Sequence, residues 1–228
     1  MPTVELRRKE WKTVDADAVV LFFSEEQIAE QAAQLSELIP AVGAARESGD
    51  LSGKAKSVVV LYSGKALRAP RLLIAGIGPA GKLSLETIRR SAAAAAKRAA
   101  QLSVRHLALP VPSGPLGGIP PEEFLQAVLE GAILSQYRFA KYITTQPDNG
   151  LVERFTVCAP TAAEQRRFQP VVEYTRTLCE GVFLARDLAN APPNEIYPET
   201  LAERAREAGN RAGFSVRVLN KAQIERLG

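Results

Sequence analysis

The sequence is poor in the residues that catalysis and disulfide frameworks commonly use. Its 228 residues include one histidine, His106, and two cysteines, Cys158 and Cys179. Two cysteines exclude a disulfide framework and a cysteine-rich zinc module. His106 has no histidine or cysteine partner nearby in the sequence, so we interpret it as an ordinary strand residue. Both cysteines lie in apolar or amphipathic segments and are interpreted as core residues.

Long apolar runs and long basic runs are missing as well. No stretch approaches the roughly 18 apolar residues that a membrane-spanning helix needs. Residues 1–10 are charged and lack the apolar core of a secretory signal, so we expect a cytoplasmic protein with no membrane partner. The formal net charge is +4, and basic residues mostly alternate with acidic ones. DNA binding through these scattered basic residues is therefore only a weakly supported alternative.

The composition is that of a globular protein, with 46% hydrophobic and 24% charged residues. Apolar runs alternate with segments of helical periodicity, which indicates an α/β layer fold with helices on both faces of the sheet. The short links within 4–23 and 57–75 also allow antiparallel pairs, so we expect a mixed sheet. The expected strands are 4–8, 17–23, 57–62, 71–75, 104–109 and 155–159, with 57–62 and 71–75 as central strands. The expected helices are 25–38, stopped by Pro40, then 84–102 and 122–142.

Details of these segments give further expectations. Ser84 is suited to cap the helix that follows it. That helix carries a stripe of alanines, which predicts a close approach to the sheet. Residues 43–56 are expected to form a polar connection, and the proline- and glycine-rich segment 110–121 a loop.

The character of the sequence changes after Pro160. We expect a long helix that begins at Pro170, a break at 190–193 and a helix over 198–212. A strand over 214–219 and a last helix over 221–227 are predicted to follow. We therefore divide the chain into an N-terminal α/β domain, 1–160, and a helical connector, 161–228.

The segment from Gly76 to Lys82 satisfies the dinucleotide-binding pattern G-x-G-x-x-G between a predicted strand and a predicted helix. It also nearly satisfies the phosphate-loop pattern, but Leu83 stands where a magnesium-binding hydroxyl is required. Pro79 removes one backbone donor, and the next strand ends at Pro110 without an acidic residue to hold a ribose. We interpret the segment as a glycine-rich turn.

Three further candidates are weak. Asp15 and Asp17 form a carboxylate pair, but they precede a strand, where acidic residues commonly mark a turn. Ser113 has no base nearby in the sequence, and the chain contains no G-x-S-x-G elbow. The residues themselves therefore assign no catalytic, cofactor-binding or metal-binding side chain.

One phrase near the C-terminal end is distinctive. Residues 186–198, RDLANAPPNEIYP, strongly resemble the interdomain segment of the leucyl aminopeptidase (cytosol aminopeptidase) family. Tyr197 stands where that family usually places threonine, so the side-chain cap of the next helix is expected to be lost, at a cost of about 1 kcal/mol. Residues 71–78 and 130–139 resemble further family segments in the same order.

The resemblance implies a non-catalytic N-terminal domain, macrodomain-like and built on a mixed α/β sheet, which serves assembly or regulation of a metallo-aminopeptidase. The family's catalytic domain uses two divalent metal ions, zinc or manganese, to hydrolyse N-terminal residues from peptides, and its members form homo-hexamers. This sequence lacks the motifs with which that domain binds its metal ions, which contain lysine, aspartate and glutamate. We therefore carry over no catalytic or metal-binding residue. The catalytic domain is expected to follow Gly228, and the 228-residue chain alone to be inactive.

Two alternatives come with the resemblance. Some bacterial members bind DNA through this domain. Macrodomains bind ADP-ribose, which suggests a nucleotide-binding module centred on Gly76–Lys82. However, Ala18–Ser24 reads AVVLFFS and lacks the two asparagines of the usual macrodomain phrase. We also expect residues 190–197 to act as a hinge-like connector, with residues after Pro193 poorly anchored without a partner domain.

Overall fold

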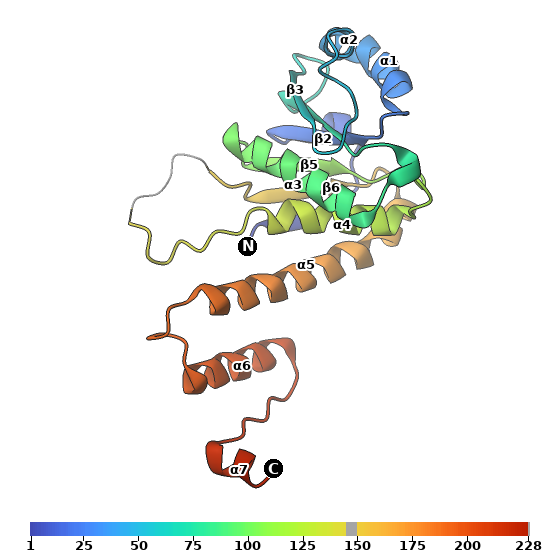
Figure 1. Ribbon diagram of the computed structural model, residues 1–228. Coiled ribbons are helices and arrows are strands. Elements are labelled where there is room, and N and C mark those ends of the chain that lie inside the picture. Colours follow the sequence, from blue (N-terminus) through green and yellow to red (C-terminus); the bar gives the residue numbers. More distant parts are fainter. Residues whose placement is uncertain (145–149, 228) are drawn as a thin grey trace. The chain divides into compact units, whose positions relative to one another are not determined.

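The computed structural model describes residues 1–144 and 150–227. Its contacts divide the chain into two compact units, Met1–Phe183 and Leu184–Gly228, which are treated separately below. The first unit contains the sheet and its covering helices (Figure 1).

The first unit is built on a six-stranded sheet in the order β1-β6-β5-β2-β4-β3. The β3–β4 pair is antiparallel and the other pairs are parallel. The predicted mixed α/β fold is therefore confirmed. The strands are β1 (Thr3–Arg7), β2 (Ala18–Phe23), β3 (Val58–Tyr62), β4 (Arg71–Gly76), β5 (His106–Pro110) and β6 (Arg154–Cys158).

Of the two short links that allowed antiparallel pairs, only the one within 57–75 makes such a pair, and the expectation that 57–62 is a central strand was wrong. The short link between β1 and β2 does not make an antiparallel pair, because β1 pairs with β6 whereas β2 lies between β4 and β5. The strand expected to be central at 57–62 is the edge strand β3. Its exposed Tyr62, with 70% of its surface accessible, fits an edge position. Strand order depends on which apolar faces meet in space, which local patterns do not encode.

Helices cover the sheet on both faces. One face packs against α3 (Leu85–Gln101), α4 (Pro121–Leu134) and buried residues of α5 (Ala162–Asn190). The other face packs against α1 (Ile28–Leu38) and α2 (Pro40–Glu47). Alternate residues of β2 supply the two cores: Val20 belongs to the first and Val19 to the second.

The predicted cap and alanine stripe of α3 both appear. Ser84 Oγ accepts a hydrogen bond from the Thr87 backbone N–H at 3.2 Å, so this residue caps the helix as expected. The buried alanines of α3 lie in the same core as sheet residues, and α3 contacts β4 and β3. Its most extensive contact is nevertheless with α4, where Gly131 permits a close approach. The small side chains therefore serve helix–helix packing as well as helix–sheet packing.

Two helix boundaries in the first half of the chain differ from expectation. Pro40 does not only stop α1 but also begins α2, so part of the connection expected at 43–56 is helical. This is physically reasonable because proline suits the first turn of a helix. Helix α4 ends at Leu134 rather than at residue 142. Just beyond this end, the buried Gln136 accepts a hydrogen bond through Oε1 from the Val152 backbone N–H at 2.9 Å.

The long helix α5 begins eight residues earlier than predicted, at Ala162, and contains Pro170 in its interior. A reciprocal cap starts it. Thr161 donates from its backbone N–H to Glu164 at 2.9 Å, and the Glu164 N–H donates to the Thr161 hydroxyl at 3.1 Å. This capping box satisfies the first amides of the helix. Pro170 was therefore wrongly interpreted as the first residue of this helix.

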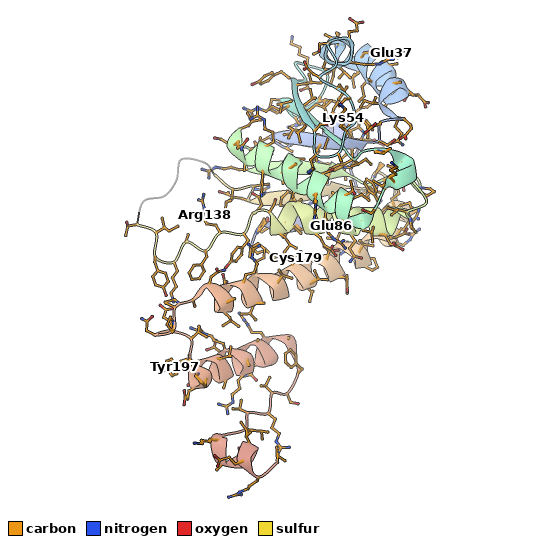
Figure 2. The ribbon with its side chains drawn as sticks, viewed as in Figure 1. Glu37, Lys54, Glu86, Arg138, Cys179 and Tyr197 are labelled. Atoms are coloured by element: carbon orange, nitrogen blue, oxygen red, sulfur yellow. The ribbon has the colours of Figure 1, made fainter. Side chains whose placement is uncertain are left out.

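The second unit contains the end of α5, then α6 (Pro198–Ala212) and α7 (Lys221–Glu225). Tyr197 precedes α6 (Figure 2) and its side chain makes no cap bond, as expected. The Thr200 hydroxyl instead accepts from the Tyr197 backbone N–H at 3.0 Å. The strand predicted at 214–219 was wrong, because these residues have no regular structure. A strand needs a neighbouring strand to complete its hydrogen bonds.

Candidate functional site

The glycine turn at residues 76–82 is filled by the chain itself. The backbone N–H groups of Gly76, Ile77 and Gly78 donate to the carbonyls of Ser57, Phe23 and Gly53 at 2.9, 3.0 and 2.9 Å. A Cβ atom on Gly76 would overlap the Lys54 carbonyl oxygen.

The turn also fails to lead directly into a helix. A short 3₁₀ turn (Ala80–Lys82) intervenes before α3. The Ala80 N–H donates to the Glu26 carboxylate at 2.9 Å, which places a negative charge where a phosphate would have to sit. The interpretation of this segment as a structural turn therefore agrees with its geometry, and a nucleotide site centred on it gains no support.

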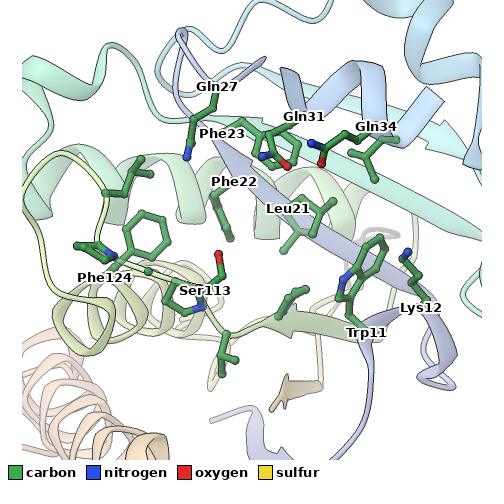
Figure 3. Close-up of a pocket in the computed structure, with 18 of the residues that line it drawn as sticks. Trp11, Lys12, Leu21, Phe22, Phe23, Gln27, Gln31, Gln34, Ser113 and Phe124 are labelled. Atoms are coloured by element: carbon green, nitrogen blue, oxygen red, sulfur yellow. The ribbon is translucent and has the colours of Figure 1, made fainter. Parts of the chain in front are cut away.

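A pocket lies elsewhere, at the carboxyl ends of β2 and β5, and has a volume of about 460 Å³. Figure 3 shows the side chains of Gln27, just before α1, and of Gln31 and Gln34 on α1 along one side, with Trp11 and Lys12 at one end and Phe124 at the other. Its remaining walls come from the second half of β2 and from the proline-rich loop. These residues are Val20, Leu21, Phe22, Phe23, Leu35, Leu38, Pro110, Val111, Pro112, Ser113, Gly114, Pro115 and Leu116.

The pocket forms where two parallel strands diverge. The pairing between β2 and β5 covers only Ala18–Leu107 and Val19–Ala108, although β2 continues to Phe23 and β5 to Pro110. From β2 the chain proceeds to β4 on one side, and then returns through α3 to β5 on the other. Such a switch point is the common ligand position in open α/β sheets.

Sequence reasoning missed this pocket. It treated residues 110–121 as a loop without a site and set Ser113 aside because no base accompanies it. The structure places Ser113 in the pocket wall, and among the residues that the structure describes neither a histidine nor a carboxylate lines the pocket. Ser113 therefore has no base there to activate it as a nucleophile. The one available signal was glutamine spacing at 27, 31 and 34, which repeats on one helix face.

His106 belongs to a polar chain across β5, β6 and β1. Its Nε2 lies 2.7 Å from the Thr156 Oγ1, and the Thr156 hydroxyl donates to Glu5 at 2.8 Å. Since that hydroxyl proton points to Glu5, His106 Nε2–H is the donor to Thr156. Burial, with a smaller contribution from the positive charge of Arg154, lowers the pKa of His106. A neutral, hydrogen-bonded strand histidine fits the interpretation made from the sequence.

The remaining candidate side chains have structural surroundings. Asp17 accepts hydrogen bonds from the Arg105 and His106 backbone N–H groups, both at 2.9 Å, while Asp15 pairs with Arg68 at 3.3 Å. The two carboxylates thus have separate partners. Both cysteines are buried and free.

Within residues 1–144 and 150–227, no three His, Cys, Asp or Glu residues gather into a group that could hold a metal ion. Nor is any helix in this part of the chain long and apolar enough to cross a membrane.

Comparison with known families places these features in context. Residues 19–146 match the family described as "Cytosol aminopeptidase family, N-terminal domain". The chain belongs to this family. The matched residues contain the pocket-forming parts of β2, α1 and the 110–116 loop, and also the glycine turn.

Relatives in this family are longer proteins. A probable cytosol aminopeptidase of Roseiflexus castenholzii is 37% identical over 184 residues, which cover 80% of this chain and 37% of the relative. One of Syntrophotalea carbinolica is 33% identical over 190 residues, covering 82% of this chain and 38% of the relative. The chain thus spans about two fifths of the length of the curated relatives it matches.

Solved structures share the fold of this chain. The bottromycin maturation enzyme BotP has a TM-score of 0.70 and 31% identity, covering 93% of this chain and 41% of that one. A further structure is that enzyme in complex with Mn. A tomato leucine aminopeptidase mutant has a TM-score of 0.78 over the whole of this chain and 46% of its own. At 23% identity, this last likeness shows the fold alone.

Proposed function

We propose that this chain is the non-catalytic N-terminal part of a metal-dependent aminopeptidase, and that it serves assembly or regulation of that enzyme. The match of residues 19–146 to the family's N-terminal domain carries the proposal. The metal ions, zinc or manganese, would be held by a catalytic domain, because the described residues offer no ligand cluster. When bound, such metal ions polarise a carbonyl and activate a water molecule.

The second unit suggests where the catalytic part of the enzyme would contact this chain. Several large apolar side chains there are exposed, including Leu201 at 45%, Phe214 at 57% and Ile224 at 55% of their surface. In this proposal, these side chains are buried against the catalytic domain. In this proposal, residues 161–228 connect the N-terminal domain to the catalytic domain, and residues 190–197 act as the hinge.

Activity assays test the non-catalytic assignment. The purified 228-residue chain, supplied with manganese or zinc, is expected to leave leucyl-p-nitroanilide intact. Robust metal-dependent turnover by this chain would contradict the proposal. The reading frame downstream of Gly228 is the second test, since a lysine- and aspartate-rich metal domain is expected there.

The docking surface is tested in the protein expressed from the complete reading frame. Phe214→Asp is expected to weaken the contact and to change the oligomeric state measured by light scattering, for which a homo-hexamer is predicted. Tyr62→Asp is the matched control, because Tyr62 is also an exposed aromatic residue, at 70% of its surface, but lies on the edge strand β3 of the first unit. An unchanged assembly with Phe214→Asp, or the same loss in both variants, would contradict the proposed surface.

A further inference from the structure

The pocket at the ends of β2 and β5 has the size and position of a ligand site but not the charge of a phosphate or peptide site. Its volume of about 460 Å³ falls in the lower part of the range typical of small-molecule pockets. Lys12 is the one charged residue in its wall. A pocket without a carboxylate offers no ion-pair partner to the ammonium group of an amino acid or peptide.

The start of α1 does not supply a phosphate-binding site to this pocket either. At the start of α1, Gln27 N–H donates to Ser24 Oγ at 3.3 Å and Ile28 N–H to Ser24 O at 3.1 Å, and residues 28–30 are not among those that line the pocket. Glutamine Oε1 of Gln27 accepts in turn from the Ser24 N–H at 3.2 Å. The first-turn amides of α1 are therefore not placed to hold an anion in this pocket. The preferred ligand is therefore uncharged.

Three glutamine carboxamides line the pocket, of which Gln27 already accepts from Ser24 N–H at 3.2 Å and Gln34 donates to Glu30 at 3.4 Å. Gln27, Gln31 and Gln34 follow the i, i+4, i+7 spacing, so their side chains lie along the same side of α1 (Figure 3). The Gln31 carboxamide makes no hydrogen bond to any part of the chain that the structure describes. A carboxamide presents a donor and an acceptor side by side, which is the pattern that pairs with the edge of a nucleobase.

Aromatic side chains supply flat apolar walls to the same pocket. Phe22 and Phe124 meet edge to face, with ring centroids 6.3 Å apart at 75°. Trp11 closes the opposite end (Figure 3). Stacking on aromatic rings contributes about 1–3 kcal/mol per base and does not require charge. The Ser113 hydroxyl is available across the pocket from the glutamines, where a further polar group of the ligand could meet it.

We infer that this pocket binds an uncharged nucleoside or free nucleobase, with Gln31 reading the ring edge and the aromatic side chains holding its faces. The inference does not rest on the aminopeptidase assignment, because it uses only the pocket's geometry and chemistry. It also differs from a phosphate-centred nucleotide site at the glycine turn, which the chain itself fills.

Trp11 gives a direct experiment, because it is the one tryptophan in the 228 residues and it lines the pocket. The purified chain is titrated with adenosine, guanosine, cytidine and uridine while tryptophan fluorescence is recorded. At least one nucleoside is expected to give a saturable change. Its 5′-monophosphate is expected to bind within about threefold of the nucleoside, since one exposed lysine contributes little.

Two variants link the signal to the pocket. Gln31→Leu is expected to weaken nucleoside binding about tenfold, the equivalent of one lost hydrogen bond. Gln101→Leu, an exposed glutamine at the end of α3, is the matched control and is expected to bind as the parent does. Ser113→Ala provides a second pocket variant on an exposed loop, and should weaken binding even if Gln31→Leu fails to fold.

Each contrary result has a defined meaning. Absence of a saturable change with all four nucleosides would overturn the inference, as would parental affinity in both pocket variants. Binding of the monophosphate or of ADP-ribose more than about tenfold tighter would show a phosphate site instead. A response to a leucyl dipeptide without a response to nucleosides would show a peptide site. Neither outcome would alter the activity assay that tests the proposed function.

Discussion

Gly131 of α4 lies directly against the backbone of Arg89 on α3. A Cβ atom at position 131 would overlap the Arg89 carbonyl oxygen and crowd its Cα atom. The same two helices are joined by an ion pair next to this contact, between the Arg89 guanidinium and the Glu130 carboxylate. The α3–α4 contact therefore combines backbone proximity with a largely buried charge pair, and it forms one wall of the main core.

Gly131→Ala is expected to destabilise the protein by about 1–3 kcal/mol or more, because backbone cannot move aside as a flexible side chain would. Gly181→Ala is the matched control within α5, where an added Cβ meets nothing within 4 Å. That change should instead stabilise by about 0.5–1 kcal/mol through helix propensity. Chemical denaturation measures both. Equal effects would contradict the close approach.

Two adjacent arginines should differ in their contribution to stability. Glu130 exposes 7% of its side chain and Arg89 35%, whereas Arg90 and its partner Glu86 expose 65% and 57%. Arg89→Met leaves a buried carboxylate without its cation and is expected to cost about 1–3 kcal/mol, a value below that of a fully buried pair because Arg89 is partly exposed.

Arg90→Met is the control for Arg89→Met. It should change the free energy of unfolding by no more than about 0.5 kcal/mol, as is usual for an exposed pair spaced four residues apart on a helix. A loss as large as that of Arg89→Met would show that burial of Glu130 does not decide the difference.

His106 should make stability depend on pH in a window that no other side chain shares. Its pKa is lowered in the folded protein, chiefly by burial, so the unfolded chain binds the proton first as the pH falls. The free energy of unfolding is therefore expected to decrease as the pH drops below about 6.5, the ordinary histidine value. The decrease ends below the folded-state pKa.

His106→Gln tests this assignment, because the sequence contains one histidine. The variant should flatten the pH dependence between about pH 5 and 6.5, where carboxylates with lowered pKa values such as Glu5 do not yet titrate. Denaturant titrations across this range supply the measurement. A slope that persists in the variant would place the titrating group elsewhere.

The two cysteines should be nearly unreactive until the protein unfolds. Burial raises the pKa of both the Cys158 and the Cys179 thiols to about 12, and Cys179 lies on the core-facing side of α5 (Figure 2). Because the thiolate is the reactive form, a disulfide reagent should modify neither at neutral pH in the native state. Both should react in denaturant. Rapid modification of the native protein would contradict their burial.

Most of the candidate functional residues could be interpreted correctly from the sequence, because the interpretation depended on residues close to them in the chain. The glycine turn lacked an acidic partner and a magnesium-binding hydroxyl, and the structure shows its amides bonded within the chain. The pocket could not be predicted, because its walls come from β2, α1 and the 110–116 loop, and its opening depends on where the β2–β5 pairing stops. Only the glutamine spacing on α1 pointed towards it.

The family, the mixed α/β fold and the approximate extent of most strands and helices could be predicted from the amino-acid sequence, because periodicity, caps and the Arg186–Pro198 motif are local features of the chain. The tertiary structure alone decided that β3 is an edge strand, that Pro170 lies inside α5 and that residues 214–219 form no strand. The edge position of β3 and the irregular 214–219 segment depend on which distant segments are neighbours, whereas the start of α5 before Pro170 is set by the local Thr161–Glu164 capping box. Hydrogen bonds and apolar faces are satisfied by whichever segments the fold brings together, and that choice belongs to the whole molecule.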